Sequence, residues 1–180
     1  MKPAADSGQP AVFLDRDGTL MRDVAYCSDP EAIEIFPGVP EALRRLRENG
    51  YKLLVITNQS GIGRGYFTDE QYRVVEAEFL RRLGPDLIAG TYYCSDLPDS
   101  GSKRRKPSPE MVFEAGREHG IDLARSFFVG DKEIDVQCGF NAGVRTILLR
   151  NDPANENETT SDWVASDLVA ATEVILEQTK

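Results

Sequence analysis

The sequence predicts an α/β fold in which one parallel β-sheet carries helices on both faces. The first indication is an alternation along the chain of short apolar segments with segments whose apolar residues recur every three or four positions, as in amphipathic helices. The second is that the apolar segments are continuous, as is typical of strands covered on both faces. Strands joined through helices form right-handed crossovers, and such crossovers build a parallel sheet.

The first two expected strands flank one helix. Ala11–Leu14 is an apolar run, and residues 51–57 form the next one. Between them, residues 40–49 are expected to be helical, because Pro40 suits the first helical turn and Gly50 suits the end.

A second helix and a third strand follow. Thr68 and Gln71 have the spacing of a capping box, which predicts a helix over residues 68–83. Residues 87–94 contain the third strand. The apolar face of the helix consists of Tyr72, Val75, Phe79 and Leu83.

The second half of the chain begins with a polar loop at residues 95–107. Ser108 is the expected cap of the next helix and Pro109 its first residue, and this helix would run to about His119. The remaining elements repeat the alternation. We expect strands at residues 126–130, 144–149 and Trp163–Ala165, the last at the sheet edge, helices at residues 133–141 and 167–177, and a polar, mobile loop at residues 151–160.

Length and composition suit one domain. We expect a flexible tail over residues 1–10 and a single domain over residues 11–180. The formal net charge of −9 argues against nucleic acid as a partner, because nucleic-acid-binding proteins present basic surfaces. No apolar run reaches membrane-spanning length, and the first residues do not resemble a signal peptide. Three widely spaced cysteines suit a reducing compartment, so we expect a cytoplasmic protein, and we expect a monomer.

Acidic residues directly follow two of the expected strands. Asp15 and Asp17 follow the first strand, and Asp131 follows the fourth. Thr57 ends the second strand, and Lys106 stands shortly before a helix. Each of these alone is as compatible with a turn or a helix cap as with a site. Together they gather at the carboxyl ends of parallel strands, where sites form in such sheets.

Three carboxylates at one sheet edge repel one another. Two unit charges at ~4 Å repel by about 4 kcal/mol at an effective dielectric constant of ~20. A divalent cation removes this repulsion, and oxygen ligands without His or Cys favour Mg²⁺. A Mg²⁺ ion, a lysine and a hydroxyl around one point suit a phosphoryl group, so the expected partner is a small-molecule phosphate ester.

Four segments of the chain resemble the four motifs of the haloacid dehalogenase (HAD) superfamily of phosphatases, in the same order. They are DRDGT at residues 15–19, TNQSG at 57–61, RKP at 105–107 and GDKEID at 130–135. The resemblance covers about residues 11–150 and implies a three-layer, Rossmann-like HAD fold. The intervals between the first three motifs have no room for a cap domain, so we expect none and an open site.

The longer string TNQSGIGRGYFTDEQY, with RKP, resembles the heptose 1,7-bisphosphate phosphatase branch of this superfamily. The resemblance implies hydrolysis of a sugar phosphate through an aspartyl-phosphate. Asp15 would be the nucleophile. Asp17 would be the general acid toward the leaving group and then the base toward water. Thr57 and Lys106 would hold the phosphoryl oxygens.

The same resemblance implies a metal site and a set of substrate contacts. Mg²⁺ would bind the Asp15 carboxylate, the Asp17 backbone carbonyl and Asp131. Asp135 would lie outside these ligands, as a partner to Lys106. The positions that match substrate contacts in the heptose branch are Asp23, Tyr26, Asn58, Gln59, Ser60, Arg105 and Lys132.

One loop departs from the heptose branch, whose members carry a Cys/His zinc site just before the RKP motif. This chain has Cys94 there, with no histidine or second cysteine nearby, so we expect no structural zinc. Specificity would come from the loops at residues 20–36, 61–67 and 95–106. Histidinol phosphate and a nucleic-acid 3′-phosphate are alternative substrates, the latter disfavoured by the net charge, and a non-catalytic binding module is a further alternative.

Overall fold

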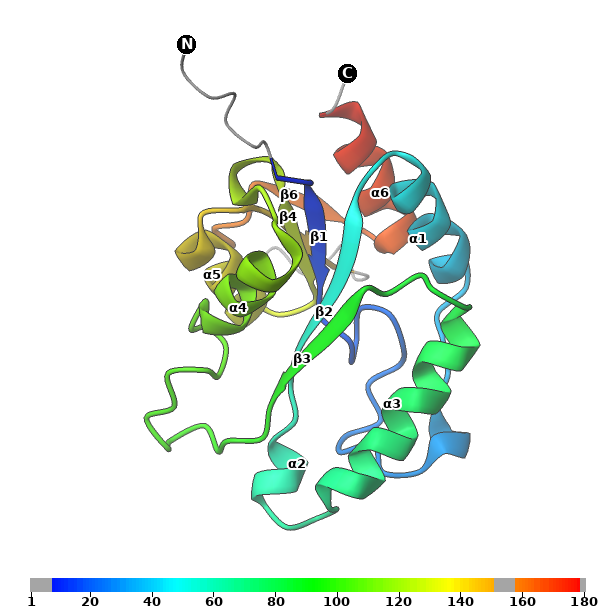
Figure 1. The fold of residues 1–180 in the computed structure, drawn as a ribbon, viewed down its shortest axis with the longest axis vertical. Coiled ribbons are helices and arrows are strands. Elements are labelled where there is room, and N and C mark those ends of the chain that lie inside the picture. The colour runs from blue at the N-terminus through cyan, green and yellow to red at the C-terminus, as the bar shows by residue number, and fades with distance from the viewer. Residues whose placement is uncertain (1–7, 151–157, 179–180) are drawn as a thin grey trace.

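The computed structural model describes residues 8–150 and 158–178, and over these residues the strands form one six-stranded sheet. The strand order is β3-β2-β1-β4-β5-β6, and all neighbouring strands are parallel (Figure 1). The predicted parallel sheet is therefore confirmed, with its last strand at an edge. The strands are β1 (Ala11–Leu14), β2 (Lys52–Asn58), β3 (Gly90–Cys94), β4 (Phe127–Gly130), β5 (Arg145–Leu149) and β6 (Trp163–Ala165).

Helices cover both faces of this sheet. The helices α1, α3 and α6 lie on one face, and α4 and α5 lie on the other (Figure 1). In β1, Val12 and Leu14 pack with the first group of helices and Phe13 with the second, as strand alternation requires. The helices are α1 (Val39–Glu48), α2 (Ser60–Gly63), α3 (Asp69–Leu83), α4 (Glu110–His119), α5 (Glu133–Ala142) and α6 (Leu168–Glu177), with 3₁₀ turns η1 (Pro30–Ala32) and η2 (Leu123–Arg125).

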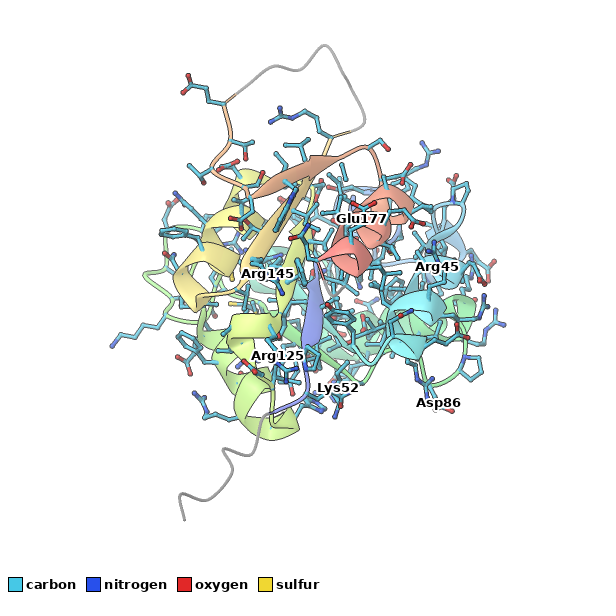
Figure 2. All side chains as sticks on the ribbon, turned by 90° about the horizontal axis from the view of Figure 1, so that it is seen from above. Arg45, Lys52, Asp86, Arg125, Arg145 and Glu177 are labelled. Atoms are coloured by element: carbon cyan, nitrogen blue, oxygen red, sulfur yellow. The ribbon has the colours of Figure 1, made fainter. Side chains whose placement is uncertain are left out.

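The end of the sheet where the strands begin carries charged side chains at its surface. Figure 2 looks onto this end and shows Lys52, Arg125 and Arg145 there. The Arg145 guanidinium lies 4.0 Å from the centre of the Phe127 ring. Asp15, Asp17 and Asp131 follow the strands β1 and β4, so they lie at the opposite end of the sheet.

The start of α3 follows the predicted capping box. The Thr68 hydroxyl accepts a hydrogen bond from Gln71 N at 3.2 Å, and Gln71 Oε1 accepts one from Thr68 N at 2.8 Å. Both bonds satisfy backbone N–H groups that a helix start leaves unpaired. The predicted apolar face of this helix is buried in the core.

The start of α4 differs from the prediction by one residue. Pro109 is the cap, because the first bond of this helix runs from Phe113 N to the Pro109 carbonyl. The Ser108 hydroxyl, expected to cap the helix, accepts a long hydrogen bond from Glu110 N at 3.4 Å and also donates to the Lys103 carbonyl of the preceding loop. The short helix α2 was not predicted either, because four residues offer no helical periodicity.

Part of the expected N-terminal tail belongs to the domain. Gln9 N donates to the Gly120 carbonyl at 3.1 Å, and the Gln9 carbonyl accepts from Asp122 N at 3.0 Å. The prediction of a free tail over residues 1–10 is therefore wrong for its last residues, which pair with the chain beyond α4. Residues 1–7 lie outside the described residues.

The connections between the first strands hold no cap domain within the described residues. Residues 15–51 form loops, η1 and α1, and residues 59–89 form loops, α2 and α3. Among the described helices, none combines the length and apolarity needed to cross a bilayer. The mobile loop expected at residues 151–160 falls largely outside the described residues.

Candidate active site

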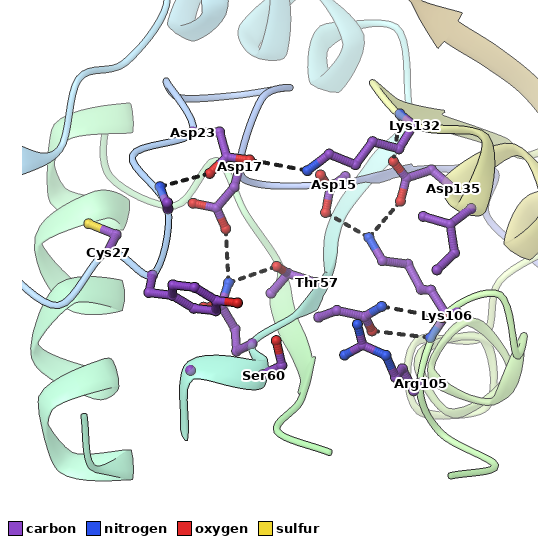
Figure 3. Close-up of a pocket in the computed structure, with 16 residues that line it drawn as sticks. Asp15, Asp17, Asp23, Cys27, Thr57, Ser60, Arg105, Lys106, Lys132 and Asp135 are labelled. Carbon is purple, nitrogen blue, oxygen red and sulfur yellow. Dashed lines mark hydrogen bonds and ion pairs between the residues drawn. The ribbon is translucent and has the colours of Figure 1, made fainter. Parts of the chain in front are cut away.

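The carboxyl ends of β2, β1 and β4 lie side by side and carry a polar cavity of about 410 Å³ (Figure 3). Asp15 directly follows β1, and Asp15 N donates to the Val129 carbonyl at 3.0 Å, which continues the pairing with β4. Asp131 follows β4, and Thr57 is near the end of β2. The parallel topology therefore brings together residues that are more than a hundred positions apart in the chain.

Lys106 lies buried between two of these acids and is 3% exposed. Its Nζ donates to Asp15 Oδ1 at 2.6 Å and to Asp135 Oδ1 at 2.7 Å (Figure 3). It also donates to the Ile56 carbonyl at 2.9 Å. Asn58 holds the lysine backbone, because its Oδ1 accepts from Lys106 N at 3.1 Å and its Nδ2 donates to the Lys106 carbonyl at 3.3 Å. The expected contact between Lys106 and Asp135 is present.

The electrostatics of this buried group favour a cation. Burial raises the pKa of Asp15 above its ordinary value, although Lys106 opposes the shift. Burial and the neighbouring Asp15 raise the pKa of Asp131 to about 7. Burial alone would lower the pKa of Lys106, but Asp135 and Asp15 hold it above its usual range. The lysine is therefore charged, and the raised pKa values of Asp15 and Asp131 show that ionising both acids is unfavourable unless a further cation offsets their charge.

Asp15, Asp131 and Asp135 form a carboxylate cluster that can hold a metal ion. Each offers one carboxylate oxygen, and these atoms lie within 4.8 Å of one another. Both oxygens of Asp135 already accept hydrogen bonds, from Lys106 Nζ and from Lys132 N at 3.1 Å. This leaves Asp15 and Asp131 as the better carboxylate ligands, and an all-oxygen donor set fits Mg²⁺.

Gly18 makes room for this cluster. Its φ of +88° lies in the left-handed region, and a Cβ there would lie 2.3 Å from Asp131 Oδ2. A side chain at this position would force the Asp131 carboxylate to move from its place in the cluster. The glycine of the DRDGT segment is thus required both for the turn after β1 and for the metal site.

The carboxylate of Asp17 is held by different groups from that of Asp15. Gln59 Nε2 donates to Asp17 Oδ2 at 2.9 Å and to the Thr57 hydroxyl at 2.9 Å. Arg16 donates to both Asp17 oxygens, at 3.1 Å and 3.3 Å. Burial raises the pKa of Asp17, and Arg16 opposes that shift. Two acids two residues apart therefore have separate environments, as distinct roles in one reaction require.

Polar and aromatic side chains form the rim of the cavity. Lys132 Nζ pairs with Asp23 Oδ2 at 3.1 Å (Figure 3). Tyr26 is 46% exposed, and its ring meets that of Tyr66 edge-on, with ring centres 4.8 Å apart. Arg105 comes from the loop before α4 and donates to the Asp96 carbonyl at 3.0 Å. The rim thus offers two cations and an aromatic face to a polar, anionic ligand.

A profile of the haloacid dehalogenase-like hydrolase family matches residues 18–149. The chain belongs to this family. The family and the hydrolase activity predicted from the four motifs are confirmed.

Known proteins match this HAD-like hydrolase over most of its length. A Helicobacter pylori protein named D-glycero-beta-D-manno-heptose-1,7-bisphosphate 7-phosphatase is 41% identical over 158 residues, which cover 86% of this chain and 89% of that protein. The Escherichia coli protein of the same name is 36% identical and covers 95% of this chain and 96% of its own. The solved structure of D,D-heptose 1,7-bisphosphate phosphatase from B. bronchiseptica, complexed with magnesium and phosphate, superposes with a TM-score of 0.83 at 29% identity, covering 94% of this chain and 99% of that one.

Most of the site residues predicted for this HAD-like hydrolase line the one cavity described above. Asp131 joins them through the carboxylate cluster. The predicted residues that line the cavity are Asp15, Asp17, Asp23, Tyr26, Thr57, Asn58, Gln59, Ser60, Arg105, Lys106, Lys132 and Asp135.

Two residues that line the cavity, Cys27 and Ile134, were not predicted. Ala25 and Gly61 also line it, and both lie within segments expected to contact the substrate, residues 23–26 and the TNQSG segment. Arg16 stands between the two acids of the first motif, and its buried side chain was not predicted, since arginine is normally exposed. Its partner Glu76 lies on α3, sixty residues away, and had no signal of its own.

Proposed function

We propose that this HAD-like hydrolase is a Mg²⁺-dependent phosphatase that removes the 7-phosphate from D-glycero-beta-D-manno-heptose 1,7-bisphosphate. The buried pair of Asp15 and Lys106 beside Asp131 carries the proposal, because it combines a nucleophile, a cation for phosphoryl oxygens and a metal ligand. The names of relatives 36–41% identical over most of the chain support this substrate. We also propose that the protein is cytoplasmic and monomeric and that it binds no structural zinc.

Asp15 would attack the phosphorus atom of the ester in the first step. A bond forms between an Asp15 carboxylate oxygen and phosphorus, and the bond between phosphorus and the sugar oxygen breaks. The proton carried by Asp17 goes to that sugar oxygen, so the leaving group departs as an alcohol. Bound Mg²⁺ would supply positive charge that offsets the carboxylates and the phosphoryl oxygens.

Water would release the phosphate in the second step. The Asp17 carboxylate accepts a proton as water attacks the phosphorus atom of the aspartyl-phosphate. The bond between phosphorus and the Asp15 oxygen then breaks, which yields inorganic phosphate and restores the Asp15 carboxylate. Lys106 and the Thr57 hydroxyl would bind phosphoryl oxygens in both steps. As donors already fixed in place, they would stabilise the negative charge that develops on these oxygens in the transition state.

The rim of the cavity would recognise the sugar and its second phosphate. Arg105 and Lys132 are cations at the cavity, suited to an anionic group. Asp23 is hydrogen-bonded to Lys132 and can accept from sugar hydroxyls with its carboxylate. The remaining contacts proposed for the substrate are Tyr26, Asn58, Gln59 and Ser60.

A phosphate-release assay with purified protein and Mg²⁺ tests this substrate. The substrates to compare are the heptose 1,7-bisphosphate, histidinol phosphate, a set of common sugar phosphates and a 3′-phosphorylated oligonucleotide. We expect the highest kcat/KM with the heptose bisphosphate and release of its 7-phosphate only. A higher kcat/KM with histidinol phosphate or with the oligonucleotide would overturn the proposed substrate.

A further inference from the structure

Arg16 has a fully buried side chain, although it stands in the loop that carries the catalytic acids. Its Nε lies 3.1 Å from Asp17 Oδ2, and its Nη2 lies 3.3 Å from Asp17 Oδ1. This is the forked geometry in which a guanidinium fixes the plane of a carboxylate. Asp17 lines the cavity and Arg16 does not, so Arg16 contacts the Asp17 carboxylate from the protein interior.

Helix α3 in turn holds Arg16. Glu76 Oε2 accepts from Arg16 Nη1 at 3.3 Å and from the Tyr72 hydroxyl at 3.2 Å. The guanidinium lies 5.4 Å from the centre of the Tyr72 ring and 5.9 Å from that of Phe79, within the range of cation–π contacts. The guanidinium therefore has partners on the Asp17 side and on the helix side.

The buried contacts of Arg16 with Asp17 and Glu76 are not what stability alone would favour. A buried ion pair often contributes nothing to stability relative to apolar residues of the same volume. Moreover, Glu76 Oε1 is buried and has no hydrogen-bond partner among the described residues. Because an unpaired buried carboxylate oxygen destabilises the fold, the contacts between Glu76 and Arg16 are better explained by a need to position Arg16 than by a gain in stability.

We propose that Arg16, held by Glu76 and Tyr72 of α3, is a positioning residue that fixes the Asp17 carboxyl where it can give its proton to the leaving oxygen. The inference rests on the proposed phosphatase chemistry but not on the identity of the sugar. Asp17 acts on the leaving group, whereas Asp15 and Lys106 act on the phosphoryl group. If Asp17 is no longer held in place by Arg16, the fall in kcat/KM should therefore be larger for an ester whose leaving group needs a proton.

The test compares kcat/KM for two esters in the Glu76→Gln variant, which keeps the side-chain size but removes the charge that holds Arg16. The leaving group of the heptose bisphosphate is the alkoxide of heptose 1-phosphate, which is poor unless protonated, whereas that of p-nitrophenyl phosphate is p-nitrophenolate, a stable anion that needs little protonation. General acid catalysis contributes about 10²–10⁴-fold, so we expect a fall of about tenfold or more for the sugar ester and of less than about threefold for the aryl ester.

Glu78→Gln is the matched control. It is the same chemical change on the same helix, but Glu78 pairs with Arg81 and Arg82 on the outer side. We expect it to leave both kcat/KM values unchanged. Thermal unfolding checks that each variant is folded. If Glu76→Gln does not fold, Tyr72→Phe removes only the hydroxyl that binds Glu76, keeps the ring beside Arg16 and carries the same comparison.

Equal falls for the two esters, or no fall for either, would overturn the positioning role. Failure of the proposed substrate is a separate result. If the wild type hydrolyses another alkyl phosphate but not the heptose bisphosphate, the proposed substrate is wrong, and that alkyl ester replaces it in the comparison. If the wild type hydrolyses no phosphate ester, the proposed function and this inference both fall.

Discussion

Replacing Lys106 by methionine removes the ammonium group that lies between Asp15 and Asp135, while the apolar stem of the side chain is kept. The two carboxylates are 8% and 2% exposed in their side chains, so water replaces little of the lost interaction. Removing one partner of a buried ion pair costs about 3–5 kcal/mol, because the remaining charge is left uncompensated. With a urea slope of about 2 kcal/mol/M, the unfolding midpoint should fall by about 2 M.

Urea unfolding of the metal-free protein, followed by circular dichroism, measures this shift. Lys132→Met is the matched control for stability, because Lys132 also pairs with an aspartate but its side chain is 55% exposed. Exposed pairs contribute about 0–1 kcal/mol, so the control midpoint should barely move. Phosphate release by Lys106→Met should fall about 10²–10³-fold, as for the loss of one donor to a developing oxyanion. Equal midpoints for the two variants would refute the buried arrangement.

Three further predictions concern Gly18, the metal and the thiols. Gly18→Ala should lose at least about tenfold in Mg²⁺-dependent activity, because its Cβ would meet Asp131. The control Gly50→Ala has the same φ of +88° but open space around the new Cβ, so it should lose only some stability through backbone strain and keep full activity. Burial and Asp15 raise the pKa of Asp131 from 3.8 to about 7, so the metal-free fold should lose stability as pH rises through this window. Added Mg²⁺ should therefore raise the thermal midpoint more near pH 8 than near pH 5, because protons compete with the metal, and equal increases would contradict this reasoning. The three cysteines are buried, and burial raises the pKa of Cys138 to about 12, so a thiol reagent should react slowly with the native protein and with all three thiols in urea; rapid labelling of the native protein would count against this packing.

Local signals predicted those elements whose cause is local. The capping box of α3 depends on two residues three positions apart, and both of its bonds are present. The placement of Asp15 and Asp131 beside each other followed from topology, because the carboxyl ends of adjacent parallel strands meet at one edge. The start of α4 was missed by one residue: Ser108 does accept from Glu110 N, but the first helical backbone bond runs to the Pro109 carbonyl.

Features that depend on distant contacts were not predictable from a single sequence. Gln9 looked like part of a free tail, and only the folded chain brings it beside Gly120. The burial of Arg16 depends on Glu76 and on the rings of α3, which no periodicity connects to the DRDGT segment. The backbone of Lys106 is fixed by Asn58, which belongs to another motif. In each case the missing information is a contact between elements.

Phosphate release by the Asp15→Asn variant measures whether Asp15 is the nucleophile of this phosphatase. The amide has almost the same size as the carboxylate, so the fold and the contact with Lys106 can persist, which thermal unfolding verifies. With saturating Mg²⁺ and the best substrate of the wild type, we expect no phosphate release by the folded variant. Turnover by Asp15→Asn within about tenfold of the wild-type rate, which is far less than loss of covalent catalysis would produce, would contradict this role of Asp15.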